Sequence, residues 1–98
     1  MWAIKIHHLV LKEDFKGIPA EHKARILKTI QKKLSLNPEG YGKPLQGEFF
    51  GYWRLRIEDY RVVYCVIKKE IVVLVIKIGM RKDDKIYKEL ILRLRRLG

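Results

Sequence analysis

The sequence predicts a single α+β domain over residues 1–98, in which a small and mainly antiparallel sheet packs against helices in the order β-α-α-β-β-β-α. The length allows one core, because 98 residues are too few for two, and 48% hydrophobic residues are enough to fill it. Apolar residues recur with helical spacing in residues 20–36 and 83–97, whereas they alternate along most of residues 52–78. Connections of two or three residues join the alternating stretches, which requires antiparallel neighbours.

The chain begins with a strand and continues into two helices. Residues 2–7 alternate in hydrophobicity, which indicates a short strand, and a helical segment over 9–16 ends at Gly17. Pro19 suits the first turn of a second helix, which we expect to reach about Leu36. The buried face of that helix is predicted to carry Ala20, Ala24, Leu27, Ile30 and Leu34.

A loop separates this helix from the rest of the sheet. The Asn37-Pro38-Glu39-Gly40 run ends the helix, and residues 41–51 are expected to form a loop because glycine and proline interrupt them. Three strands follow, at residues 52–57, 60–67 and 71–78. The final helix, 83–97, has acidic residues at its start and arginines at its end, as the helix dipole favours.

The composition excludes several classes of protein. One cysteine, Cys65, cannot form a disulfide within the monomer, so a reducing compartment is expected. The longest apolar run, residues 71–76, is far shorter than the roughly 20 residues that span a bilayer. Lys5 and the His7-His8 pair interrupt any signal-peptide core at the N-terminus. We therefore expect a cytoplasmic protein with no membrane association.

The formal net charge is +11, with 22 Lys+Arg against 11 Asp+Glu. A field of this size favours polyanions, of which nucleic acid is the commonest in a cytosol. A charge-rich solvated surface of the thermophile kind explains the same numbers, because 34% of residues are charged and only Gln31, Asn37 and Gln46 carry amide side chains. Composition alone leaves both interpretations open.

The predicted hairpin at Glu58-Asp59 places arginines on one face of the sheet. If those two residues form the loop, Arg56 lies opposite Arg61 and Arg54 lies opposite Val63. The same face then collects Tyr52, Arg54, Arg56 and Arg61 over an apolar floor of Val63, Cys65, Leu74 and Ile76. Two arginines in direct opposition repel unless an anion lies between them or they fan apart. Such a strip binds phosphates and stacks bases, although a merely solvated face is an equal alternative.

Other chemistry is not indicated. His7, His8 and His22 lack partners at metal-ligand spacing, so no metal site is expected. The glycines between residues 40 and 51 do not match a phosphate-binding loop, and no cofactor is expected.

The run from Lys43-Pro44-Leu45-Gln46-Gly47 through Gly51-Tyr52-Trp53-Arg54-Leu55-Arg56, continuing over residues 57–64, 72–81 and Tyr87, resembles the RelE toxins of the RelE/ParE superfamily. The resemblance covers essentially the whole chain. It implies the toxin of a type II toxin–antitoxin system, held inactive by a cognate antitoxin, that enters the ribosomal A site and cleaves mRNA without a metal. The implied partners are therefore an antitoxin, the ribosome with its rRNA, and mRNA.

The resemblance assigns the scissile phosphate to Arg54, Arg61, Arg81 and Tyr87. Arginine does not deprotonate in proteins, so Arg61 and Arg81 would stabilise the charge that develops on the phosphoryl oxygens. Arg54 would neutralise backbone phosphate. Tyr87, with a reference pKa of roughly 10, would stack on a base, orient the 2′-hydroxyl, or act as a base if cations lower its pKa. Padding of the last helix against the sheet is the alternative role for Tyr87.

The chain departs from RelE enzymes at one position. Tyr52 stands where well-studied members carry a lysine, two residues before Arg54, so the general base and acid are not assigned. Contacts to RNA are expected from Tyr52, Arg56, Lys32, Lys33 and Lys82. A ParE-like inhibitor of DNA gyrase and a relative that only binds antitoxin or RNA are the alternative functions.

Overall fold

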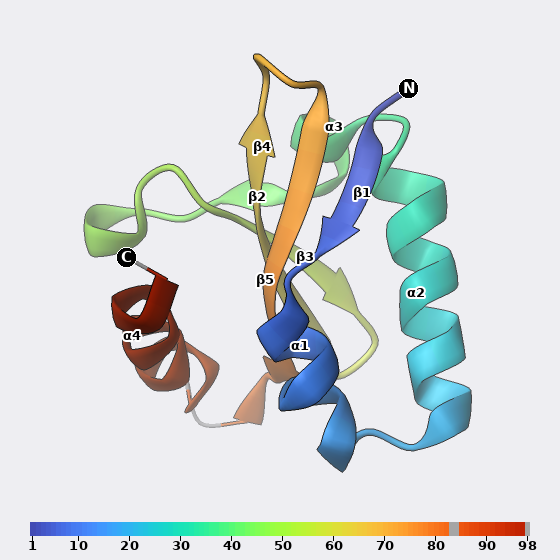
Figure 1. Ribbon diagram of the computed structural model, residues 1–98, viewed down its shortest axis with the longest axis vertical. Helices are drawn as coiled ribbons and strands as arrows, with labels where there is room; N and C mark the ends of the chain where they lie inside the picture. Colours follow the sequence, from blue (N-terminus) through green and yellow to red (C-terminus); the bar gives the residue numbers. More distant parts are fainter. Residues whose placement is uncertain (83–84, 98) are drawn as a thin grey trace.

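A computed structural model describes residues 1–82 and 85–97 (Figure 1). The elements are β1 (Ala3–Ile6), α1 (His8–Lys12), η1 (Asp14–Gly17), α2 (Ala20–Leu34), α3 (Pro38–Tyr41), β2 (Lys43–Pro44), η2 (Gly47–Phe49), β3 (Trp53–Ile57), β4 (Tyr60–Ile67), β5 (Val72–Met80) and α4 (Lys85–Leu97). The α+β class and the predicted order of the major elements are confirmed. The prediction of a structureless loop over 41–51 is wrong, because it holds β2 and the short η2 helix. Asp83 and Asp84, predicted to begin the last helix, lie outside the described residues.

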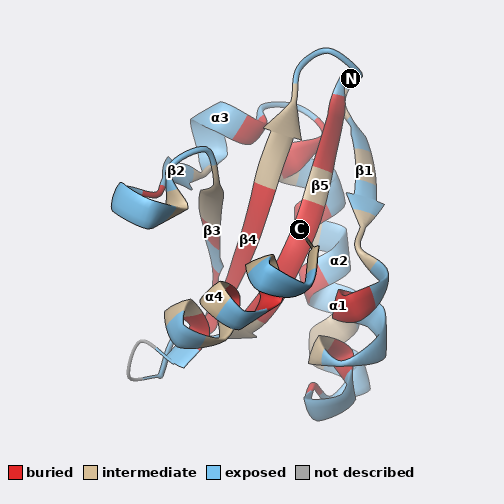
Figure 2. Ribbon diagram, turned by 60° about the vertical axis from the view of Figure 1, so that its left-hand side comes forward, coloured by how far each residue is buried: buried red, intermediate tan, exposed pale blue. Residues whose placement is uncertain are grey.

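The five strands form one sheet in the order β1-β5-β4-β3-β2. Neighbours are antiparallel except β1, which pairs with β5 in parallel. Figure 2 shows buried residues concentrated along β4 and β5, the central strands. The edges of the sheet are β1 and β2, and these lie at opposite sides of the domain.

Helices cover both faces of the sheet, as Figure 1 shows for α2 and α4. The first core lies between the sheet and the layer of α1, η1 and α2, and includes Val62, Tyr64 and Val75. The second core lies under α4, where Ile86 and Leu90 contact Val63, Ile76 and Leu45 of the opposite face. The predicted apolar floor is thus largely covered by α4.

The buried face of α2 confirms Ile30 and Leu34 from the prediction but not the other three residues. Ile26, Ile30 and Leu34 are buried, whereas Ala20, Ala24 and Leu27 are exposed. Ile26 and Leu27 are adjacent in sequence, so either can begin an apolar stripe. The stripe of Ile26, Ile30 and Leu34, spaced four residues apart, is the one that packs in the first core.

The β3–β4 hairpin has the predicted register, with Arg56 opposite Arg61 and Arg54 opposite Val63. Between β4 and β5 the register shifts, because Val63 pairs with Lys77 and the next residue, Tyr64, pairs with Val75. This bulge reverses the alternation of β5. It places Lys77 toward α4 and returns Ile78 to the first core.

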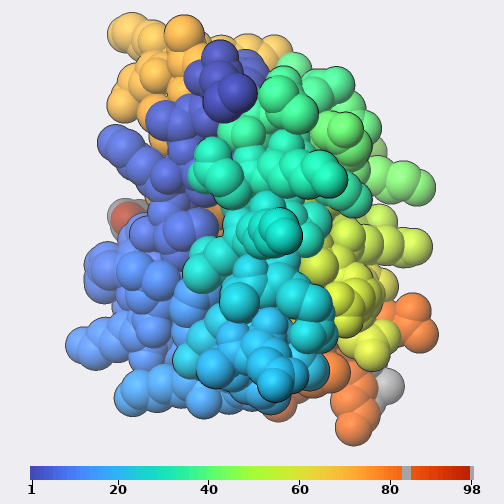
Figure 3. All heavy atoms as spheres, turned by 90° about the vertical axis from the view of Figure 1, so that its right-hand side faces the viewer, coloured from blue at the N-terminus to red at the C-terminus, as the bar shows by residue number. Residues whose placement is uncertain are grey.

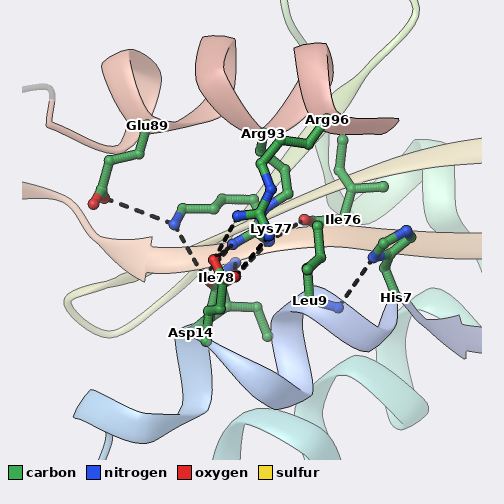
Figure 4. Close-up of polar contacts among 10 residues, drawn as sticks. His7, Leu9, Asp14, Ile76, Lys77, Ile78, Glu89, Arg93 and Arg96 are labelled. Atoms are coloured by element: carbon green, nitrogen blue, oxygen red, sulfur yellow. Dashed lines mark hydrogen bonds and ion pairs between the residues drawn. The ribbon is translucent and has the colours of Figure 1, made fainter. Parts of the chain in front are cut away.

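A buried ionic network fixes α4 to β5 and η1 (Figure 4). Oδ1 of Asp14 accepts hydrogen bonds from Lys77 Nζ at 3.0 Å and Arg93 Nη2 at 2.8 Å. Its Oδ2 accepts from the Ile78 backbone N–H at 2.9 Å and from Arg93 Nη1 at 3.1 Å. The side chains of Asp14, Lys77 and Arg93 are only 2%, 9% and 4% exposed. Because α4 carries Tyr87, the network also helps to place that residue.

Candidate nucleic-acid interface

Four arginines and one tyrosine meet at a pocket of about 250 Å³, here called the arginine pocket. β3 supplies Arg54 and Arg56, β4 supplies Arg61, Arg81 follows β5, and α4 supplies Tyr87. Ile86 completes the lining. The register of the hairpin and the position of α4 therefore bring together the four residues predicted to act on phosphate, along with Arg56.

Arg61 is the buried cation of the pocket, with 6% of its surface exposed. Its Nη1 donates to the backbone carbonyls of Tyr60 at 2.9 Å and Glu58 at 3.2 Å. Desolvation and the neighbouring Arg56, Arg54 and Arg81 guanidinium groups lower the pKa of Arg61. Arginine stays protonated even so, and the repulsion is relieved by an anion placed among the four groups.

Arg54 and Tyr87 contact each other inside the pocket. Arg54 Nη1 donates to the Tyr87 hydroxyl at 3.2 Å, while Arg54 Nε is buried without a hydrogen-bond partner among the described residues. The Tyr87 ring packs on the second core, with its centroid 5.9 Å from that of Phe49. Tyr87 thus pads the helix and also presents its hydroxyl to the pocket, so the two predicted roles are compatible.

The remaining predicted RNA contacts are spread around the site. Tyr52 is half-buried against the second core and does not line the arginine pocket, and burial raises its pKa. Lys82 lies beside Arg81 in a shallow depression, and Lys32 is exposed on α2. Lys33 is half-buried, with its Nζ 5.6 Å from the centroid of the Tyr41 ring.

A second pocket, here called the edge pocket, contains residues that the sequence did not reveal. It measures about 120 Å³ and is lined by Lys33, Tyr41, Lys43, Arg54, Leu55 and Arg56. Lys43 lies opposite Arg54 because β2 pairs with β3. Only this pairing, which a two-residue strand does not signal, places Lys43 beside Arg54.

The described residues contain no group of three or more His, Cys, Asp or Glu arranged to hold a metal ion. Burial raises the pKa of the Cys65 thiol, which makes it a poor nucleophile. Within the same residues, no helix has both the length and the apolar character that crossing a bilayer requires.

Comparison with known proteins identifies the family. Residues 5–85 match the model of the ParE toxin of the type II toxin–antitoxin system parDE. The chain belongs to the RelE/ParE toxins. No curated protein sequence gives a significant match to this toxin.

Solved structures of RelE toxins share the fold. The toxin–antitoxin complex RelBE2 of Mycobacterium tuberculosis matches with a TM-score of 0.76 and 22% identity, over 82% of this toxin and 98% of that chain. A double arginine-to-alanine mutant of the E. coli toxin RelE in the free state matches with a TM-score of 0.70 and 22% identity, over 94% and 96%. The archaeal RelE–RelB complex of Pyrococcus horikoshii matches with a TM-score of 0.59 and 28% identity, over 84% and 97%.

Proposed function

We propose that this RelE/ParE toxin is a metal-independent endoribonuclease that cleaves mRNA in the ribosomal A site and so halts translation. The observation that carries the proposal is the convergence of Arg54, Arg56, Arg61 and Arg81 with Tyr87 around one pocket. Among the described residues, no carboxylate lines that pocket. A phosphodiester fits it, because the negative charge offsets four mutually repelling cations.

The reaction is attack by a ribose 2′-hydroxyl on the adjacent phosphate. The O2′–P bond forms and the P–O5′ bond breaks, which leaves a 2′,3′-cyclic phosphate and a 5′-hydroxyl. One proton leaves O2′ and one reaches O5′. The transition state gathers charge on the non-bridging oxygens, which Arg61 and Arg81 stabilise because both line the arginine pocket.

Proton transfer falls to Tyr87 in this proposal. Arginine cannot accept a proton at neutral pH. Tyr87 is therefore the residue of the described pocket lining whose side chain can transfer a proton. Tyr87 donates its phenolic proton to O5′ as the P–O5′ bond breaks, while a solvent water takes the proton from O2′ and afterwards returns one to the phenolate. The hydrogen bond from Arg54 to the Tyr87 oxygen orients the hydroxyl and stabilises the transient phenolate. Tyr52, at the position of the family lysine, is too far into the second core to line the pocket and is assigned no proton transfer.

The proposed protein partner is a cognate antitoxin. The RelBE2 and RelE–RelB structures are toxin–antitoxin complexes, and their toxin chains share this fold. An acidic or amphipathic segment lying over the arginine pocket would neutralise it by charge complementarity. The ribosome is the second partner, approached through rRNA by the exposed lysines of α2, which include Lys32.

Cleavage in a reconstituted translation reaction, mapped by primer extension on the mRNA, tests the proposal. Wild-type toxin should cut within the A-site codon, and Arg81→Ala should lower the rate about 10²–10³-fold, the usual effect of removing one charge-stabilising group. Arg81 is exposed, so the variant should fold normally. Arg95→Ala, an exposed arginine on α4 outside the pocket, is the matched control. Absence of cuts by wild-type toxin refutes the proposal.

Inhibition of DNA gyrase is the second candidate, and the match to the ParE model favours it. A gyrase supercoiling assay separates the two. Inhibition of supercoiling by purified toxin, with mRNA intact in the translation reaction, would assign the ParE-like function.

A further inference from the structure

The edge pocket continues the arginine pocket around the β2 edge of the sheet. Arg54 and Arg56 line both, so the two cavities share a wall. In Figure 3, the green residues after α2, the yellow residues of the β3–β4 hairpin and the orange residues after β5 follow one another along one margin of the molecule. An extended ligand bound in one pocket can therefore reach the other pocket.

The two pockets together are lined by six cations, which are Lys33, Lys43, Arg54, Arg56, Arg61 and Arg81. Among the described residues, none of the six has a carboxylate within 4.0 Å. The cations that do form ion pairs lie elsewhere, at Arg25, Lys68, Lys77, Arg93 and Arg96. The carboxylates that form ion pairs therefore lie away from this strip of six cations. This leaves the strip suited to an external polyanion.

The fold holds the edge pocket in place despite its repulsions. Lys43 lies directly opposite Arg54, and like charges in such a pair are destabilising. Gly42 allows the close approach, because a Cβ there would lie 1.8 Å from the Tyr64 hydroxyl and 3.1 Å from the Arg54 carbonyl oxygen. The Lys33 ammonium sits over the Tyr41 ring, which remains 50% exposed. An anion bridging Lys43 and Arg54 relieves the repulsion.

We infer that the edge pocket is a subsite for the nucleotide next to the scissile phosphate of a single-stranded RNA. This inference rests on the proposed function. Tyr41 stacks on the base, and Lys43 with Arg54 binds the phosphate. Arg54 and Arg56 lie two residues apart on one face of β3, about 7 Å along the strand, so each can contact a successive phosphate of an extended RNA. The exposed aromatic ring favours RNA over an acidic peptide, which has no base to stack.

The stacking contact is tested with the full chain and a short RNA that carries a 2′-deoxynucleotide at its cleavage position, so that it binds without being cut. An abasic residue replaces each nucleotide in turn, and affinity is measured by fluorescence anisotropy. At one position the abasic RNA should bind wild-type toxin roughly 5- to 140-fold more weakly. Tyr41→Ala should lose as much affinity for the intact RNA and nothing further for that abasic RNA, whereas Tyr41→Phe should behave as wild type.

The phosphate contact is tested by salt dependence. Lys43→Ala should reduce the slope of log affinity against log salt by about 0.7, the value for one phosphate on a single strand. Lys5→Ala is the matched control, because Lys5 is an exposed strand lysine at the opposite edge of the sheet. It should leave the slope of the wild-type toxin unchanged.

The outcomes separate this inference from the proposed function. If wild-type toxin cleaves A-site mRNA but Tyr41→Ala shows the same abasic penalties as wild type, the subsite is overturned and the nuclease stands. If the coupling and the slope change appear without any cleavage, the nuclease fails, and the edge pocket remains a binding site for single-stranded RNA with no scissile phosphate beside it. If Tyr41→Ala and Lys43→Ala weaken antitoxin binding but not RNA binding, the edge pocket binds a peptide and the inference is wrong.

Discussion

Asp14→Asn tests how α4 is held in place. The substitution removes the buried carboxylate that balances the two buried cations Lys77 and Arg93. Asp14 accepts four hydrogen bonds, from Lys77, Ile78 and twice from Arg93. Asparagine keeps one acceptor oxygen and loses the charge, so Lys77 and Arg93 remain buried with only the half-exposed Glu13 and Glu89 nearby. Breaking a buried pair in this way costs about 3–5 kcal/mol.

This loss is a large part of the roughly 5–15 kcal/mol that stabilises a typical domain. At about 4 kcal/mol, the Tm should fall by roughly 15–30 °C for a chain of this size. Urea unfolding followed by the fluorescence of Trp2 and Trp53 measures the change directly. Glu13→Gln is the matched control, because Glu13 is the neighbouring carboxylate and pairs with Arg96 in solvent. A loss for Asp14→Asn no larger than that of Glu13→Gln would refute the reasoning.

A triple replacement gives a second check on the same network. When Asp14→Leu is combined with Lys77→Met and Arg93→Met, no buried charge is left unbalanced. The triple variant should therefore lose less stability than Asp14→Asn alone. A greater loss in the triple variant would show that packing or the Arg93 hydrogen bond to the Ile76 carbonyl, rather than charge balance, dominates.

Three further changes have defined outcomes. Ile71 is half-exposed and has a φ of 57°, in the left-handed region that a β-branched residue adopts only at a cost in free energy. Asparagine adopts this region more easily, so Ile71→Asn should raise the free energy of unfolding, measured by urea titration, by about 1 kcal/mol. Gly42→Ala should cost about 1–3 kcal/mol through the clash with the Tyr64 hydroxyl, and thermal melts should show a smaller additional loss when Tyr64→Phe is already present. The hydrogen bond from Arg96 lowers the pKa of Glu13 from 4.5 to about 2, so its stabilisation is present above pH 4.5 and is lost as the pH falls toward 2. The stability difference between wild type and Glu13→Gln should therefore shrink over that interval, and a constant difference would contradict the assignment.

Local patterns in the sequence predicted the parts of the fold that local contacts determine. The Glu58-Asp59 loop fixes the register of its hairpin, and with it the opposition of Arg56 and Arg61. The parallel pairing of β1 with β5 could not be predicted in this way, since Ala3 and Val72 lie far apart in the sequence. The bulge opposite Val63 and Tyr64 has no sequence signal either, because residues 71–76 form an unbroken apolar run that fits either alternation.

The site was predictable to the extent that the hairpin and the resemblance located it. Arg54, Arg61, Arg81 and Tyr87 do converge, but the expected exposure of Tyr52 depended on an open sheet face. Packing of α4 on that face leaves Tyr52 half-buried against the second core instead. A helix with a strong apolar stripe must cover some surface, yet which face it covers depends on long-range contacts such as that between Arg93 and Asp14.

The distribution of charge bears on the two interpretations of the +11 net charge. A merely solvated surface intersperses the two signs, so most cations lie near a carboxylate. Here Glu13, Asp14 and Glu89 are gathered where α4 meets η1 and β5, and they pair with Lys77, Arg93 and Arg96. On the far edge of the sheet, the strip from the edge pocket to the arginine pocket carries its cations without carboxylate partners among the described residues. Under the proposed function, that separation would steer a polyanion to the strip, and added salt would weaken the steering.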